Sequence, residues 1–323
     1  MPRHRQPKPQ RVVTVLIAAT LLMSGLYCRS RQEVPTSPSV ATAPPPGPPK
    51  VSKRPRRQTR PDPPASQGIR DGGGIIAPTS GDPNLLLGNP SRATASVTDR
   101  DNYLLERKQY ALSYNNADGR PNWVSWRLVS EDLGPEERGQ FQTDPDLPEG
   151  FTTVAPTDYR GSGYDRGHLC PSGDRTASRE ANDATFYMSN MMPQAADNNQ
   201  KSWATLENYC RDLANAGNVL YIVCGPVGKV GTIGRVAAVS VPESTWKVVA
   251  VLPRRAAGLA QVSTKTRVFA VIIPNRNGPD IADGDWGKWR VPVRDVEKAT
   301  GLDFFSRLSP SLQSALETRT DDE

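Results

Sequence analysis

Hydrophobic residues are arranged in several short segments of this chain in ways that are typical of β-strands. Trp123–Leu128 alternates with a period of two, as a half-buried strand does. Three later runs are rich in β-branched residues and end at glycine or proline, so they also predict strands: Val219–Val223, Trp246–Leu252 and Arg267–Ile273.

Two segments have the signals of helices. Asp197–Ala216 predicts one helix that ends at Gly217, because glycine is common just past a helix C-terminus. Arg294–Thr300 predicts a second helix, again followed by a glycine, Gly301. Strands outnumber helices and do not alternate regularly with them. We therefore predict an α+β fold, with a mostly antiparallel central sheet flanked by helices.

The N-terminus has the composition of an export signal. Four basic residues precede an apolar run, Val12–Cys28. This order is typical of a signal peptide, and an uncleaved membrane anchor is the alternative. We assign residues 1–29 to a signal peptide or a membrane or lipid anchor. The protein is then expected to be exported: secreted, periplasmic or surface-tethered. Cys28 is a candidate for lipid attachment, although the bulky Tyr27 fits that signal poorly.

Residues 30–80 are predicted to be a basic, proline-rich disordered linker. Residues 31–70 contain eleven prolines, and the linker includes a basic cluster, Lys50–Arg57. So few apolar residues cannot form a core. A solvated spacer is the favoured interpretation, and a polycationic arm that holds nucleic acid is the alternative. The folded domain is predicted to span residues 84–312, followed by a disordered tail over 313–323.

The positive charge of the chain lies in this N-terminal part. Residues 1–70 carry 13 Lys/Arg against two acidic residues, whereas the remainder carries 27 against 32. A basic pI often indicates a nucleic-acid-binding surface. Here it says nothing about the folded domain, so its function has to be argued from candidate site residues.

Three cysteines remain beyond Cys28: Cys170, Cys210 and Cys224. A disulfide between Cys210 and Cys224 and buried free thiols are both consistent with the sequence. A structural zinc site is not expected, because there is no CxxC pair and the domain has a single histidine.

That histidine, His168, is the first candidate for chemistry. It lies in the run Asp165-Arg166-Gly167-His168. An imidazole that titrates near neutrality suits a general base. The guanidinium of Arg166 would disfavour the protonated imidazole and could neutralise a phosphate.

The second candidate group lies on the predicted helix. Asp197 is a suitable N-cap, which puts Asn199 in the first turn. Asn199, Trp203 and Glu207 then share one side of the helix, with about 12 Å along the axis between Asn199 and Glu207. If both serve one metal ion, Asn199 is the direct ligand and Glu207 acts through water. Such an oxygen-only, water-rich site suits Mg²⁺. An ordinary capped helix with Trp203 in the core is the alternative.

Taken together, these motifs resemble the DNA/RNA non-specific endonucleases, the ββα-metal group that includes mitochondrial endonuclease G. The resemblance covers roughly residues 95–310. The similar segments, in order, are Asp165–His168, Pro171–Thr176, Glu180–Phe186, Ser189–Gln194, Asn198–Gln200 with Trp203, Leu206–Glu207, Cys224–Pro226 and Thr300–Phe305.

The resemblance implies a ββα-metal motif and a role for each matching residue. His168 matches the general base, Asn199 the single protein ligand of Mg²⁺, and Glu207 the acid that orients metal-bound water. Arg166 matches an arginine that contacts the phosphate, and Asn190 a second asparagine near the site. The implied activity is endonucleolytic cleavage of DNA and RNA without sequence preference, with Mg²⁺ as cofactor and Mn²⁺ as its substitute. A homodimer and a partner inhibitor protein are further implied possibilities.

Three other interpretations remain at this stage. A serine esterase would pair Ser162 or Ser172 with His168, although the chain has no G-x-S-x-G motif. A binding protein could keep the fold without catalysis. Alternatively, the basic N-terminal part could have the principal role, with the domain as its cargo.

Overall fold

The structure, a computed structural model, describes residues 81–253 and 258–322. The predicted signal segment (1–29) and linker (30–80) lie outside the described residues. None of the described helices is long and apolar enough to cross a membrane.

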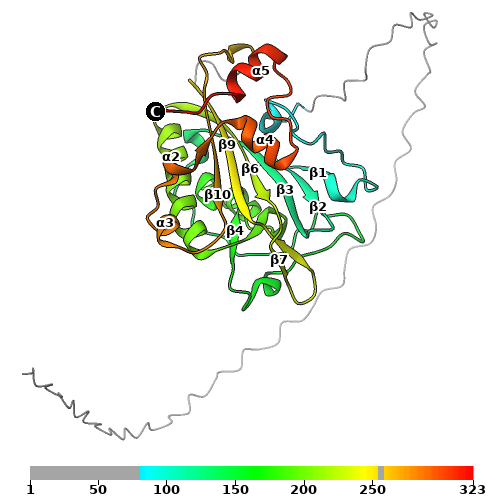
Figure 1. Ribbon diagram of the computed structural model, residues 1–323. Helices are drawn as coiled ribbons and strands as arrows, with labels where there is room; N and C mark the ends of the chain where they lie inside the picture. The colour runs from blue at the N-terminus through cyan, green and yellow to red at the C-terminus, as the bar shows by residue number, and fades with distance from the viewer. Residues whose placement is uncertain (1–80, 254–257, 323) are drawn as a thin grey trace, which may run out of the picture. The chain divides into compact units, whose positions relative to one another are not determined.

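A seven-stranded antiparallel sheet forms the centre of the described domain, in the order β1-β2-β3-β6-β9-β10-β11 (Figure 1). Its strands are β1 (Tyr103–Glu106), β2 (Ala111–Asn115), β3 (Arg120–Leu128), β6 (Asn218–Val227), β9 (Ser244–Pro253), β10 (Arg267–Pro274) and β11 (Arg290–Val291). The four strands expected from the sequence are β3, β6, β9 and β10. The predicted α+β architecture with a mostly antiparallel sheet is therefore confirmed.

Both faces of this sheet are buried, and the period of two divides its side chains between two hydrophobic clusters. Along β6, Leu220 and Ile222 pack into one cluster, whereas Val219 and Tyr221 pack into the other. This double burial explains why the central strands read as nearly continuous apolar runs.

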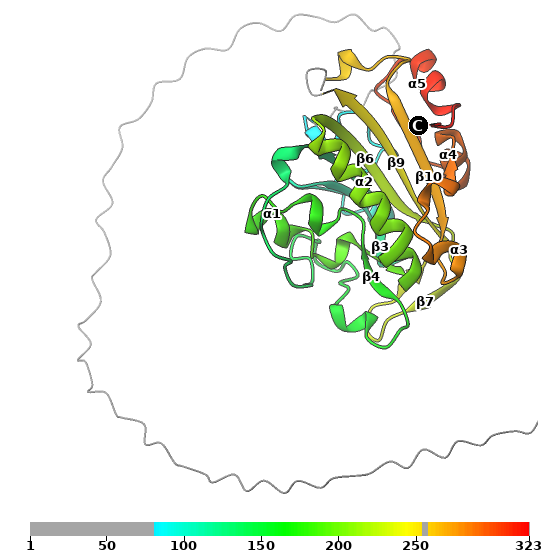
Figure 2. The ribbon, with the colours of Figure 1, turned by 90° about the vertical axis from the view of Figure 1, so that its left-hand side faces the viewer.

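Helices cover the two faces in separate layers (Figure 2). On one side lies α2 (Ala204–Asn215), which packs Leu206 and Cys210 against the sheet. On the other lie α4 (Val293–Thr300) and α5 (Pro310–Glu317). The short helices α1 (Arg179–Ala184) and α3 (Pro279–Ala282) complete the set.

A smaller two-stranded sheet lies in the α2 layer. It pairs β4 (Asp165–His168) with β5 (Met191–Gln194), and the chain then enters a π-helical segment, Asn198–Trp203, that continues into α2. Two strands followed by a helix make the expected ββα unit. A second hairpin pairs β7 (Gly231–Ile233) with β8 (Val239–Val241).

Two expectations need correction. The helix predicted over Asp197–Ala216 is not α-helical in its first turns, because residues 198–203 form a π-helix. Residues 313–323 were expected to be a disordered tail, yet α5 extends to Glu317 and buries Leu316 against the sheet. The helix forms because packing, rather than local propensity, stabilises so short a segment.

Candidate active site

The pairing of β4 with β5 brings the two predicted groups of site residues together. Asp165 lies opposite Gln194, and His168 lies opposite Met191. Gly167 allows this approach, because a Cβ at this position would collide with the side chain of Gln194. The same Gln194 donates a hydrogen bond to Asn198 Oδ1 at 2.5 Å, which ties the strand pair to the π-helical segment.

His168 lies in an apolar pocket at the end of β4 and is 8% exposed. Its ring packs edge-on against Phe186 at 4.9 Å between centroids, and against Phe141 at 5.5 Å. Burial, and next the nearby charge of Arg138, lower the pKa of His168 to about 3. Nε2 is buried and has no hydrogen-bond partner among the described residues. The imidazole is therefore neutral at physiological pH, with a ring nitrogen unpartnered.

Arg138 is a residue that the sequence interpretation missed. Its guanidinium carbon lies 5.5 Å from the centre of the Phe186 ring, next to His168. Its charge lowers the pKa of His168 and opposes the raised pKa of Glu207, so it acts on both predicted groups. The side chain is exposed and makes no ion pair within the described part of the chain. Nothing local in the sequence distinguishes it from other surface arginines.

Asn199 is oriented by a carboxylate on the neighbouring strand. Its Nδ2 donates to Asp165 Oδ2 at 2.9 Å, and Gln200 Nε2 donates to the same oxygen at 2.8 Å. A carboxylate only accepts hydrogen bonds, so the amide nitrogen of Asn199 must face Asp165. Asn199 Oδ1 points the other way and accepts no hydrogen bond from the residues described.

The π-helical segment that carries Asn199 is fixed to the main sheet layer. Asn198 Nδ2 donates to the Pro274 carbonyl at 2.9 Å, and Ser202 Oγ donates to the Ile281 carbonyl at 2.7 Å. Asp197 lies at the N-cap as predicted, which puts Asn199 in the first turn, but its side chain makes no capping hydrogen bond and accepts from the Gly278 amide instead. π-Helical turns are frequent at functional sites, where they re-aim a side chain.

Glu207 lies two turns further along, half-buried, and its carboxylate accepts no hydrogen bond from the described residues. Burial raises the pKa of Glu207 to about 7, while the charge of Lys247 opposes this effect. Lys247, on β9, is 1% exposed and has its ammonium 4.2 Å from the Trp203 ring centre. The sequence interpretation missed Lys247 as a site residue. The signal that could have found it is a lysine within the apolar run of a predicted central strand.

Arg211 is fixed on the same face of α2. Its Nη1 donates to Asp174 Oδ1 at 2.8 Å, and the other oxygen of Asp174 accepts from Trp126 Nε1 at 3.0 Å. Its charge also lowers the pKa of Glu207. The charges of three cations, Lys247, Arg211 and Arg138, therefore oppose the effect of burial on the pKa of Glu207.

Arg166 is only partly available to a ligand. Its Nε and Nη2 donate to the Pro156 carbonyl at 3.2 and 3.1 Å, and its guanidinium lies 4.9 Å from the Phe141 ring centre. Because residues i and i+2 share a face of a strand, Arg166 and His168 both lie against Phe141.

Asn190 has a different environment from the other predicted site residues. It is 0% exposed, its Oδ1 accepts from the Cys170 amide, and its Nδ2 donates to the carbonyls of Cys170 and Thr185. These bonds leave it no polar hydrogen for a ligand. It fixes the chain just after His168, where the Leu169 amide also donates to the Asn190 carbonyl.

The residues present fit a magnesium ion. Asn199 offers a neutral oxygen that is held in orientation but unpartnered, and Glu207 offers a carboxylate without hydrogen bonds. Mg²⁺ prefers oxygen ligands and retains several of its waters. A cation would also offset the burial that keeps the pKa of Glu207 high.

The serine hydrolase interpretation finds no support in the geometry. Ser162 Oγ donates to the Tyr164 carbonyl, and Ser172 Oγ accepts from Asn182 Nδ2; neither bonds to His168. The cysteines Cys170, Cys210 and Cys224 are buried free thiols.

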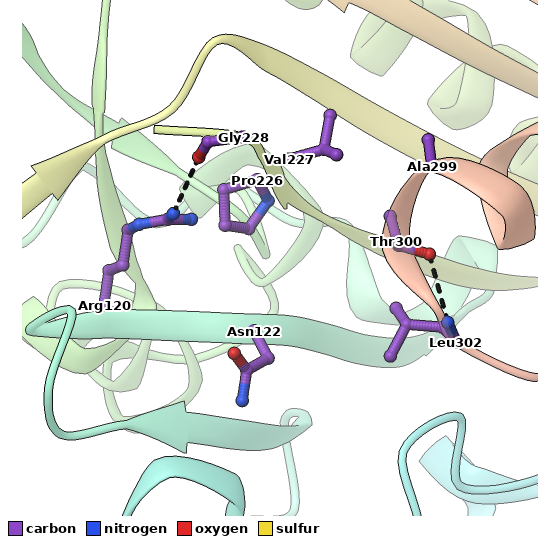
Figure 3. A pocket seen from close by; sticks show the side chains of 8 residues that line it. All are labelled: Arg120, Asn122, Pro226, Val227, Gly228, Ala299, Thr300 and Leu302. Atoms are coloured by element: carbon purple, nitrogen blue, oxygen red, sulfur yellow. Dashed lines mark hydrogen bonds between the residues drawn. The ribbon is translucent and has the colours of Figure 1, made fainter. Parts of the chain in front are cut away.

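A polar recess of about 150 Å³ lies elsewhere, between the ends of β3, β6 and α4 (Figure 3). Arg120 donates to the Gly228 carbonyl across it at 3.1 Å, and Leu302 and Thr300 line its far side. It contains none of the predicted site residues.

Comparison with known proteins identifies similar chains. Residues 88–311 match the family model described as DNA/RNA non-specific endonuclease. A nuclease of Nostoc sp. is 50% identical over 239 residues, which cover 74% of this chain and 86% of that protein. Nuclease C1 of Cunninghamella echinulata var. echinulata is 35% identical over 243 residues, covering 70% of this chain and 89% of that protein.

Among solved structures, a chain from the crystal structure of the EndoG/EndoGI complex, which concerns EndoG inhibition, has a similar fold. The TM-score is 0.59 at 25% sequence identity, and the match covers 76% of this chain and 97% of the other.

Proposed function

This chain belongs to the DNA/RNA non-specific endonuclease family, and on that premise we propose that it hydrolyses phosphodiester bonds in DNA and RNA, without sequence preference, in a Mg²⁺-dependent reaction. One observation carries the proposal. A neutral histidine with an unpartnered ring nitrogen and an asparagine with an unpartnered, oriented oxygen lie on one ββα unit.

His168 is the proposed general base. Its imidazole takes a proton from the water that attacks phosphorus and carries that proton as a cation. The apolar walls of Phe141 and Phe186 keep the free enzyme's imidazole neutral and ready to accept. An anionic phosphate beside the ring raises the pKa of His168 on binding, because it favours the charged imidazolium.

Asn199 is the proposed protein ligand of the metal, and Glu207 holds its water. When bound, the ion supplies positive charge to a non-bridging oxygen and to the departing oxygen. Asp165 holds the Asn199 amide nitrogen, which leaves Oδ1 free to hold the ion. Asn190, with all its bonds internal, acts as a positioning residue for His168 rather than in contact with the substrate.

Arg166 and Arg138 are the proposed phosphate contacts. Both lie beside the aromatic pair that surrounds His168, and a guanidinium matches phosphate oxygens with parallel hydrogen bonds. Contacts of this kind address the sugar–phosphate backbone and not base edges. We therefore expect little sequence preference and a strong dependence of binding on salt.

The test is digestion of supercoiled plasmid and of a structured RNA by the full-length protein, in Mg²⁺ and in EDTA. We expect nicking, then linearisation and degradation of the plasmid, in Mg²⁺ alone, with Mn²⁺ able to replace it. A folded protein that leaves both substrates intact in Mg²⁺ and in Mn²⁺ would contradict the endonuclease proposal.

Replacing Lys247 with methionine is expected to shift the pH profile of cleavage towards alkaline pH. Burial already raises the pKa of Glu207 to about 7, and the charge of Asp174 acts in the same direction. Among the cations that lower this pKa, Lys247 has a larger effect than Arg211 or Arg138. Without Lys247 the pKa of Glu207 increases further, so the ionised fraction falls first on the acid side. We expect kcat/KM near pH 6 to fall roughly tenfold relative to wild type, corresponding to about one pKa unit, with recovery above pH 8.

Lys247→Arg is the matched control, because it keeps the charge between Trp203 and Trp126. Its pH profile should stay close to that of the wild type. A uniform loss of activity at every pH in Lys247→Met, at an unchanged melting temperature, would mean that Lys247 acts otherwise than through Glu207.

Outside the described residues, we propose that residues 1–29 export the protein or tether it, with 30–80 as a spacer. EndoG, the protein of similar fold, was solved with the inhibitor EndoGI, which supports a search for an inhibitor protein of this chain. A homodimer is proposed on the family resemblance alone, and sedimentation of the purified protein tests it.

A further inference from the structure

The β7–β8 hairpin lies beside the candidate active site. Its two strands are joined by residues 234–238, and β8 packs against β5, whose partner strand β4 ends at His168. Ala237 of the hairpin shares a hydrophobic cluster with Phe141, which contacts the His168 ring. The hairpin and the 3₁₀ turn Pro156–Tyr159 lie side by side at one end of the domain (Figure 1, Figure 2).

Asp158, in that turn, fixes the tip of the hairpin. Its Oδ1 accepts hydrogen bonds from three successive amides, those of Arg235, Val236 and Ala237, at 3.0, 2.9 and 3.4 Å. Its Oδ2 accepts from the Ala155 amide at 2.9 Å. Burial alone would raise the pKa of Asp158, but these amides outweigh it and lower the pKa, so the carboxylate is ionised and holds them strongly. Val236 is 93% exposed, so the tip projects from the domain while its backbone is already ordered, which reduces the entropy cost of binding.

The hairpin and the adjoining turn carry a local excess of positive charge. Residues 151–166 and 229–241 contain four Lys/Arg and two Asp/Glu, and both acids already accept hydrogen bonds from the chain itself. Two of the cations, Arg160 and Arg235, are exposed, and their side chains form no ion pair or hydrogen bond with the described residues. Residues 71–323 are negatively charged overall, so these free guanidiniums mark a place where an anion is attracted to an otherwise acidic body.

The same turn connects these cations to a proposed phosphate contact of the active site. The carbonyl of Pro156, its first residue, accepts from Arg166 Nε and Nη2 at 3.2 and 3.1 Å, whereas Asp158, its third, holds the hairpin tip. A 3₁₀-helix rises about 2 Å per residue, so these two anchors are only about 4 Å apart along the turn. Arg160 follows the turn directly. Arg166, Arg160 and Arg235 are therefore held by one short segment and extend the positive surface outward from the active site.

We propose that the β7–β8 hairpin, through Arg235 and the neighbouring Arg160, binds the sugar–phosphate backbone of the nucleic-acid substrate beyond the scissile bond. This inference rests on the proposed nuclease activity and adds a second stretch of backbone to the contact of Arg166. Closely spaced phosphates are complementary to a set of unpaired guanidiniums. Because such contacts address charge and not base edges, they increase the affinity for long polymers without adding sequence preference.

The test measures the binding of the full-length protein to a fluorescently labelled DNA duplex in EDTA, by anisotropy at several salt concentrations. We expect Arg160→Ala combined with Arg235→Ala to weaken binding roughly tenfold at about 0.1 M salt. The slope of log Kd against log salt concentration should decrease by about 1.8, since each phosphate contact contributes about 0.9. The basic N-terminal segment is present in every variant, so its own contribution cancels in the comparison.

Lys265→Ala combined with Lys298→Ala is the matched control. It removes the same charge from two exposed side chains that form no ion pair with the described residues. Lys265 precedes β10 at the end of β9 far from the hairpin, and Lys298 lies on α4, on the other face of the sheet. The affinity and the salt slope of this variant should stay close to those of the wild type.

Cleavage in Mg²⁺ gives a second measurement. The double arginine variant should show a higher KM for the duplex at a nearly unchanged kcat. It should also hydrolyse a p-nitrophenyl phosphodiester at the wild-type rate, because so small a substrate does not reach the hairpin. An unchanged Kd and salt slope, or a loss no larger than that of the lysine control, overturns the hairpin contact. So does an equal loss of ester hydrolysis, which would mean that the substitutions disturb the active site itself. Because binding is measured in EDTA, a wild-type protein that cleaves nothing would refute the nuclease proposal without altering this measurement.

Discussion

Substitution of His168 by alanine is expected to lower the rate of plasmid nicking in Mg²⁺ by about 10²–10⁴-fold, the usual contribution of a general base. The ring is buried between Phe141 and Phe186, and its Nε2 has no partner within the domain. Removing it therefore breaks no hydrogen bond of Nε2. First-order rates of nicking at saturating enzyme measure the effect. His168→Gln, which fills more of the space, controls for the cavity, and the melting temperatures of both variants check folding.

A substrate with a better leaving group then distinguishes whether His168 acts as a general base at the attacking water or as a general acid at the departing oxygen. A base at the attacking water is still required when the departing group is p-nitrophenolate, whereas an acid at the departing oxygen is not. We expect His168→Ala to remain as impaired on a p-nitrophenyl phosphodiester as on DNA. Near-wild-type turnover of the nitrophenyl ester would assign His168 to the departing oxygen instead.

The sheet was predictable because its strands obey a rule that is local in the sequence. β6, β9 and β10 are buried on both faces, so Val, Ile and Leu fill consecutive positions. The edge strand β11 has two residues, too few for any period to be visible. The π-helical turn at 198–203 was missed since it depends on distant anchors, such as the bond from Asn198 to the Pro274 carbonyl. The tail helix α5 was missed for a similar reason, because Leu316 is a helix-stabilising contact only once the sheet exists.

The candidate site was predictable wherever its chemistry is concentrated in short motifs. His168 and Arg166 are two residues apart on one strand, so they were found together. Arg138 lies in an irregular segment and reaches His168 only through tertiary packing against Phe186. Asn190 was grouped with the catalytic residues because it matches a second asparagine near the site of the family that the sequence resembles. Only its hydrogen bonds, all to the chain's own backbone, distinguish positioning from contact.

The pairing of Asp165 with Asn199 makes an unusual prediction about the metal ligand. Asn199→Ala is expected to lose nearly all cleavage, about 10³-fold or more, since metal ions contribute several kcal/mol to the transition state. Binding of Mn²⁺, followed by electron paramagnetic resonance, should weaken in parallel. Asn199→Asp would ordinarily be a conservative or even favourable change, because carboxylates bind Mg²⁺ well. Here it brings a carboxylate oxygen against Asp165 Oδ2, at a position now occupied by the Asn199 amide nitrogen at 2.9 Å.

Asn199→Asp alone is therefore expected to be nearly as inactive as Asn199→Ala, despite its additional charge. Exchanging the pair, Asp165→Asn with Asn199→Asp, restores a donor facing an acceptor. Gln200 Nε2 donates to the same Asp165 oxygen as Asn199, so in the double variant the Gln200 amide has to turn and accept, through Oε1, from the second hydrogen of the new amide nitrogen. We expect this double variant to recover Mn²⁺ binding and to cleave at least tenfold faster than Asn199→Asp alone. That ratio corresponds to a coupling of about 1.4 kcal/mol between the two positions. Asp165→Asn alone, which sets two amides side by side, completes the cycle. If Asn199→Asp alone is fully active, or if the double variant gains nothing over it, Asp165 does not orient the metal ligand, and the order of this site rests on the π-helical backbone alone.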